Sequence, residues 1–141
     1  TFNRAGGRAT LMSYGLSGEE YDACTLDEMV NHTARIIPKA HIDFLRSFQP
    51  WHQSGDYLFV HAGIMPGLHI EDQDEVDLRW IRDRFTNCQE DHGALVIHGH
   101  SITDAVDERP NRIGIDTGAY VSGILTALAL EGEERWLLQT G

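Results

Sequence analysis

Two short apolar runs, each ending at a histidine, decide the fold: Tyr57-Leu-Phe-Val-His61-Ala-Gly63 and Ala94-Leu-Val-Ile-His98-Gly-His100. Four apolar residues rich in valine, isoleucine and aromatic side chains are typical of a buried strand. The glycine that follows within two residues allows the backbone to turn sharply where the strand ends. Strand ends are where α/β scaffolds present functional groups. We therefore expect histidine side chains to gather at one edge of a sheet.

The first third of the chain carries helix signals instead. Residues 1–16 are expected to form a glycine-rich entry segment. The stretches Ser17-Gly-Glu-Glu20 and Thr25-Leu-Asp-Glu28 both match the capping box, in which the first side chain and the fourth bond each other's backbone N–H groups. A short helix is predicted to begin at each.

A further helix is predicted to begin at Pro38, with the proline at its first position, and to end before Pro50. Within it, Ile42, Leu45 and Phe48 follow one another at three-residue spacing. That spacing places them on one side of a helix and predicts a buried face.

From Gly55 onward strands dominate. They are predicted at 57–60, 94–97 and 112–115, and a hairpin is predicted from 122–130 and 135–138. The order does not match a complete alternating βαβ domain. The sequence therefore predicts the α/β class, of the α+β kind, with residues 1–141 as one structural unit.

Composition narrows the classes of partner. The 141 residues carry a formal net charge of −11, which argues against nucleic acid and against an anionic membrane surface. No apolar stretch approaches the ~20 residues of a membrane span. Cys24 and Cys88 do not form a Cys-x-x-Cys pair, so they are expected to be reduced thiols of a cytoplasmic protein.

The histidines are the first candidates for chemistry, because neutral imidazole is the commonest transition-metal ligand. His61 ends one strand, and His98-Gly-His100 ends another, where one histidine could bind a metal while the other supports it. A buried structural histidine is the alternative at each position. Two imidazoles are too few for a metal site, which needs three or more ligands.

Carboxylates and arginines near these histidines are the next candidates. Asp56, Asp104 and Asp116 could complete a metal site, although the Asp-Thr-Gly context of Asp116 favours capping of a turn. Arg82 is the preferred anion-binding residue, because the planar guanidinium matches two phosphate oxygens. Its competitors are Arg79 and Arg84.

Four motifs then occur in a familiar order: Gly55–Gly67, Leu78–Arg82, Val96–Ser101 and Asn111–Ala119. Together they resemble the C-terminal half of calcineurin-like metallophosphoesterases, with the bacterial serine/threonine phosphoprotein phosphatases as the most similar branch. The resemblance implies an αββα sandwich with two divalent metal ions at the strand ends, manganese first, with iron or zinc as alternatives. It also implies a metal-dependent hydrolase (phosphatase) acting on phosphoric monoesters, in which a metal-bridging hydroxide attacks phosphorus.

By the same resemblance, His61 and His100 are metal ligands and Arg82 binds the substrate phosphate. The substrate would be a phosphorylated protein or a small phosphoester. Symmetrical dinucleoside tetraphosphatases share these motifs and give the alternative substrate. In this chain, Ser101 stands where the family has threonine after the second histidine, and His98 stands outside the expected ligand set.

The family's other metal motifs, Gly-Asp-x-His-Gly, Gly-Asp-x-x-Asp-Arg-Gly and Gly-Asn-His-Glu, are absent from residues 1–141. The chain is therefore expected to be a partial domain, a fragment or one part of a longer protein, that is inactive alone. A non-catalytic binding module that keeps half of the fold is the rival interpretation. Uncovered sheet edges and apolar faces would favour self-association of such a fragment.

Overall fold

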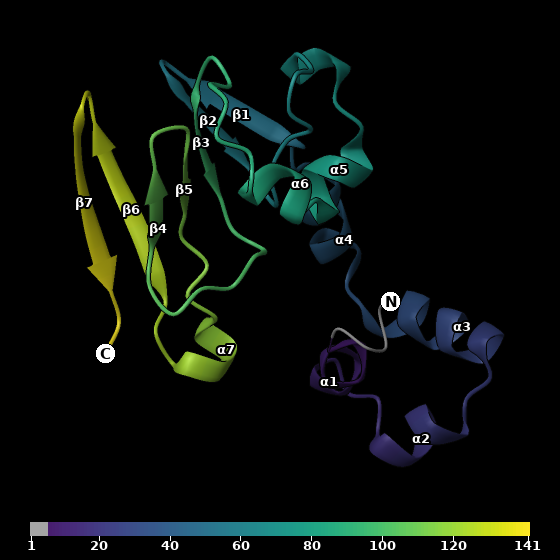
Figure 1. Cartoon of the computed structure of the whole chain (residues 1–141). Coiled ribbons are helices and arrows are strands. Elements are labelled where there is room, and N and C mark those ends of the chain that lie inside the picture. The colour runs from purple at the N-terminus through teal and green to yellow at the C-terminus, as the bar shows by residue number, and fades with distance from the viewer. Residues whose placement is uncertain (1–5) are drawn as a thin grey trace. The chain divides into compact units, whose positions relative to one another are not determined.

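The computed structural model describes residues 6–141 and divides the chain into two compact units, Thr1–Phe48 and Gln49–Gly141 (Figure 1). The first unit is entirely helical in its described part. Its helices are α1 (Gly7–Ser13), α2 (Gly18–Ala23), α3 (Leu26–Ile36) and α4 (Lys39–Arg46).

Both predicted capping boxes are present. The Ser17 hydroxyl accepts a hydrogen bond from the Glu20 N–H, and the Glu20 carboxylate accepts one from the Ser17 N–H. Thr25 and Glu28 repeat this arrangement at the start of α3. These helices begin where the sequence predicts, because the cap is a local interaction within four residues.

Three expectations for this unit are wrong. The predicted entry segment at 1–16 contains helix α1, which buries Leu11 completely; residues 1–5 of that segment lie outside the described residues. Pro38 is the N-cap of α4 and precedes its first helical residue. The predicted buried face is mostly exposed: Ile42 is half-buried, but Leu45 is 58% exposed and Phe48, just beyond α4, is 59% exposed. Helical spacing sets which side chains share a face, but not whether that face is covered.

The second unit contains a five-stranded mixed sheet in the order β1-β2-β3-β5-β4. Its central strands, β2 (Tyr57–Val60), β3 (Leu95–His98) and β5 (Arg112–Gly114), are parallel. They match the predicted strands to within a residue at each end. The edge strands, β1 (Trp51–Ser54) and β4 (Asp107–Arg109), are antiparallel to their neighbours and were not predicted.

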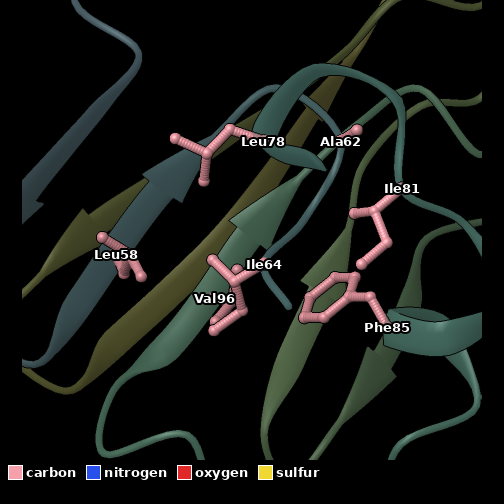
Figure 2. Close-up of a cluster of buried hydrophobic side chains, with 7 residues drawn as sticks. All are labelled: Leu58, Ala62, Ile64, Leu78, Ile81, Phe85 and Val96. Carbon is pink, nitrogen blue, oxygen red and sulfur yellow. The ribbon is translucent and has the colours of Figure 1, made fainter. Parts of the chain in front are cut away.

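The two faces of this sheet differ, because successive side chains of a strand point to opposite sides. Leu58 and Val96 are register partners on one face. They pack in an apolar cluster with side chains from α5 (Glu75–Trp80) and α6 (Asp83–Thr86), which Figure 2 shows. The short 3-10 helix η2 (Ile70–Asp72) precedes α5. The members of the cluster are Leu58, Ala62, Ile64, Leu78, Ile81, Phe85 and Val96.

Gly63 is required by this packing. A Cβ atom at position 63 would lie 2.2 Å from the Phe85 ring, which is itself fully buried. The chain leaving β2 can therefore pass under α6 only without a side chain at this position. This close approach fixes the path of the segment that follows His61.

The other face of the sheet lies toward a separate two-stranded sheet, β6 (Thr126–Glu131) and β7 (Glu134–Gln139). Tyr57 donates a hydrogen bond from its hydroxyl to the Gly132 carbonyl in the hairpin turn. The predicted hairpin is thus present, but residues 119–122 form helix α7 (Ala119–Ser122) and the strand begins only at Thr126.

Within the second unit, α5 and α6 therefore lie on one side of the main sheet and a second sheet lies on the other, which confirms the predicted α/β class (Figure 1). No helix in the part of the chain that the structure describes has the length and apolar character of a membrane span. Cys24 and Cys88 are both free thiols.

Candidate functional site

The two strand-end histidines meet at one edge of the main sheet. Strands β2 and β3 are parallel and adjacent, so the residues that follow them emerge side by side. The Gly99 N–H donates a hydrogen bond of 2.9 Å to the His61 carbonyl, which joins the two strand ends directly. The His61 and His100 ring centroids are 5.2 Å apart. The pairing of β2 with β3 thus places two imidazoles next to each other.

His100 adopts a backbone conformation that is uncommon for a side-chain-bearing residue. Its φ angle is 63°, the one positive value at a non-glycine residue within 6–141. The Arg82 guanidinium donates a 3.1 Å hydrogen bond to the His100 carbonyl. The Trp80 ring lies edge-on to the imidazole, with centroids 5.5 Å apart. Left-handed backbone at a bulky residue is found most often at functional sites, where surrounding contacts hold it.

One nitrogen of His100 is left for a ligand. Its Nε2 atom is buried and has no hydrogen-bond partner among the described residues. Buried polar atoms are usually paired, so an unpaired one indicates a strained or functional position. An imidazole nitrogen with a free lone pair is suited to bind a metal ion.

The electrostatic surroundings keep the His100 ring neutral. Partial burial lowers its pKa, and the positive charge of Arg82 and the neighbouring His61 lower it further, while Asp116 acts in the opposite direction. A lowered pKa means that the lone pair stays available at neutral pH, because the protonated form is disfavoured. This is the protonation state that a metal ligand requires.

Arg82, the predicted phosphate-binding residue, is brought to the same place. It is exposed and lies between α5 and α6 as the N-cap of α6. Its competitor Arg79 forms an ion pair with Glu75 one turn away on α5. Arg82 thus contacts the His100 backbone, and its role in binding phosphate stays a prediction.

The three predicted carboxylates have different positions. Asp116 lines a cavity of about 370 Å³ together with His61 and His100. Its Oδ1 accepts a hydrogen bond from the Gly118 N–H, so it caps the turn as the sequence favours. Asp56 precedes β2 and lies at the opposite end of that strand from His61, and Asp104 is exposed in the loop before β4.

The fit to a metal ion is partial. His61 and His100 present adjacent imidazoles, and the unpaired Nε2 of His100 has the chemistry of a ligand atom. Within residues 6–141, no group of three or more histidine, cysteine, aspartate or glutamate side chains could hold an ion by itself. The pair fits one side of a coordination shell whose remaining ligands would come from other residues.

Sequence reasoning missed a polar cluster on the face of the main sheet that packs against α6. His98 is 3% exposed and Arg112 is 5% exposed, and they contact each other beneath α6. Gly99 separates His98 from His100. A signal was present in the sequence, since Arg112 begins an otherwise apolar predicted strand and a buried charge requires partners.

Comparison with known proteins gives a likeness of fold. The chain is similar to the crystal structure of a proposed diadenosine tetraphosphatase, with a TM-score of 0.61 and 17% sequence identity, over 95% of this chain and 65% of that one. This chain therefore spans about two thirds of the length of that protein. No protein-family model matches the chain, and no curated protein matches it. The mixed α/β arrangement of this chain is one that a larger solved protein also has.

Proposed function

We infer that this chain carries part of the active site of a metal-dependent phosphoester hydrolase. In this proposal His61 and His100 bind a divalent metal ion, and Arg82 binds the phosphoryl group of the substrate. The observation that carries the proposal is the buried, unpaired Nε2 atom of His100. The centroid of the His100 ring lies 5.2 Å from the centroid of the His61 ring. The similar fold of a proposed diadenosine tetraphosphatase supports the same class of reaction.

The roles of these side chains follow from their chemistry. Bound divalent ions would supply Lewis-acid activation of water and of the phosphoryl oxygens. Arg82 is exposed and uses one nitrogen, Nη1, for the His100 carbonyl. Its remaining N–H groups point to a role in orienting a phosphoryl group and stabilising charge on its oxygens.

The isolated chain is expected to be a poor catalyst. Two imidazoles hold at most one side of a metal shell, and two-metal hydrolysis needs bridging carboxylates as well. Manganese is our first expectation for the metal, and iron or zinc are the alternatives, since imidazole with carboxylate suits all three. We expect measurable turnover only where further ligands join His61 and His100.

A phosphoserine or phosphothreonine side chain of a protein is the substrate that we propose first. The competing substrate is a dinucleoside tetraphosphate, which the name of the similar structure favours. Both are phosphate esters or anhydrides with several anionic oxygens, so Arg82 serves either. Rates on a phosphopeptide and on diadenosine tetraphosphate, measured with the same preparation, separate the two.

The decisive experiment uses the protein expressed from its complete reading frame. His61→Ala and His100→Ala should each lower phosphatase turnover by at least about 100-fold, and Arg82→Ala should lower it comparably through transition-state stabilisation. His69→Ala is the matched control, because His69 is an exposed histidine of the same unit. Near-normal turnover of the His100→Ala protein would overturn the proposal.

Metal titration separates the enzyme from its rival. The wild-type protein should bind Mn²⁺ or Zn²⁺, and the two alanine variants should bind it more weakly. A protein that folds stably, binds neither ion and hydrolyses neither substrate would instead be a non-catalytic module that keeps the fold.

A further inference from the structure

The cluster beneath α6 contains a buried arginine whose hydrogen bonds define its surroundings. Arg112 Nη2 donates to the Asp107 carboxylate at 2.7 Å and to the Thr86 carbonyl at 3.0 Å. Its Nη1 lies 3.3 Å from Nε2 of His98. Asp107 also accepts a hydrogen bond from Arg109, so its carboxylate is held from two sides. The position of the Arg112 guanidinium is therefore fixed by three different segments.

These contacts determine the tautomer of His98. A guanidinium can only donate hydrogen bonds, so Nε2 of His98 must accept the one from Arg112. The other ring nitrogen, Nδ1, lies 3.1 Å from the Gly99 carbonyl, which can only accept. One assignment satisfies both contacts, namely a neutral ring with its proton on Nδ1. His98 thus receives a hydrogen bond on one side and donates one on the other.

The Gly99 carbonyl that receives this hydrogen bond belongs to the peptide unit before His100. The Ser101 N–H donates to the same carbonyl at 2.7 Å. The His100 carbonyl, on the other side of the residue, receives the bond from Arg82. Side chains therefore hold both peptide units that flank His100. Left-handed backbone is unfavourable at a residue with a side chain, and these bonds oppose its relaxation.

We propose that Asp107, Arg112 and His98 are positioning residues that hold the His100 backbone in its left-handed conformation and so aim its imidazole at the ion it shares with His61. The direction of support runs from Asp107 to Arg112, then to His98, then to the Gly99 carbonyl. None of the three touches the ion or the substrate. The inference rests on the proposed function of His61 and His100.

The tautomer of His98 is the first test, because it needs no variant. In ¹⁵N-resolved NMR of the wild-type protein, His98 should show a neutral ring with the proton on Nδ1. A ring protonated on Nε2, or on both nitrogens, would overturn the proposal. In the Arg112→Met protein, Nε2 loses its donor while the Gly99 carbonyl still accepts from Nδ1, so we expect the Nε2-protonated ring to gain population beside the Nδ1 form. An unchanged tautomer in that variant would show that Arg112 does not set it.

Two variants of equal shape test the bond to Gly99. In His98→Asn, the side-chain amide nitrogen stands where Nδ1 stood and keeps a donor, whereas His98→Leu has a similar shape without one. A cavity of about 710 Å³, lined in part by His98 and Arg112, gives both changes room. Hydrogen exchange of the Gly99 and Ser101 amides should accelerate about tenfold in the leucine variant and no more than about threefold in the asparagine variant.

Binding of Zn²⁺ alone supplies the functional readout. Loss of a residue that orients a metal ligand typically weakens metal affinity by about 10–100-fold, and we expect this for His98→Leu and Arg112→Met, with recovery in His98→Asn. Equal losses in the asparagine and leucine variants would mean a merely structural role and would overturn the proposal. Unchanged exchange protection in His98→Leu would do the same, and if that variant fails to fold, the wild-type tautomer still decides.

If the proposed function is wrong, the same experiments give a different combination of results. If wild-type protein binds no Zn²⁺ while His98 carries its proton on Nδ1 and His98→Leu loses amide protection, the metal role of His61 and His100 is wrong. The control of the His100 backbone by His98 would then stand without it.

Discussion

Different interactions stabilise the interiors of the two units of this chain. In the second unit, parallel strands far apart in sequence bury a continuous apolar cluster against α5 and α6 (Figure 2). In the first unit, α3 and α4 bury no residue, and Leu11 and Leu16 are its buried large side chains among the described residues. Local capping boxes begin two of its helices. Most of the buried apolar side chains of the described residues therefore lie in the unit that holds the candidate site.

The largest expected effect is at the centre of the second unit. Phe85 is fully buried and packs against the Gly63 backbone. Phe85→Ala should lower the free energy of unfolding of this unit by about 3–5 kcal/mol, because the removed ring leaves a cavity. Denaturant unfolding followed by tryptophan fluorescence measures it, because Trp51, Trp80 and Trp136 all lie in the second unit. A loss below about 1 kcal/mol would mean that the core is much less well packed than the comparison assumes.

A smaller effect is expected at the matching position of the first unit. Leu11 is also fully buried, but Leu16 is the one other buried hydrophobic side chain among the described residues of its unit. Leu11→Ala should cost about 2–3 kcal/mol and should accelerate amide exchange in α1 and α2 only. Faster exchange in β2 and β3 of the same variant would show that the two units unfold together and would contradict the comparison.

Variants of the capping boxes test how much local interactions stabilise the helices of the first unit. Ser17→Ala removes the side chain that accepts the Glu20 N–H and should cost about 1 kcal/mol. Amide exchange at the start of α2 reports this cost, and Ser13→Ala, within α1, is the control for loss of a hydroxyl. If α2 exchanges at the same rate with and without Ser17, packing rather than capping holds this helix.

The smallest effect is expected on the exposed face of α4. Leu45 is 58% exposed, so Leu45→Ala removes little buried surface, and leucine and alanine have similar helix propensities. We expect a change within about 0.5 kcal/mol, measured by thermal unfolding. A much larger loss would mean that this face is covered in solution, for example by a second copy of the chain, as the sequence analysis expects for a partial domain.

Much of the sheet could be predicted from local sequence. The central strands are continuous apolar runs, and such runs are recognisable without knowing their neighbours. The edge strands β1 and β4 were missed because they are polar and gain their conformation from the strands they pair with. Helix α1 was missed because the glycines near it favour a loop. Gly7 is the first residue of the helix, and Gly6 and Gly15 lie just outside it.

The sequence by itself determined which residues could carry chemistry: His61, His100 and Arg82 follow short motifs, and their chemical types limit what they can do. Only the tertiary structure decided that the rings of the two histidines approach each other, that His100 has a left-handed backbone and an unpaired buried nitrogen, and that His98 faces the opposite side. These features depend on which strands pair and what packs on each face. Contacts between residues far apart in the chain set them, and no local pattern of residues specifies such contacts.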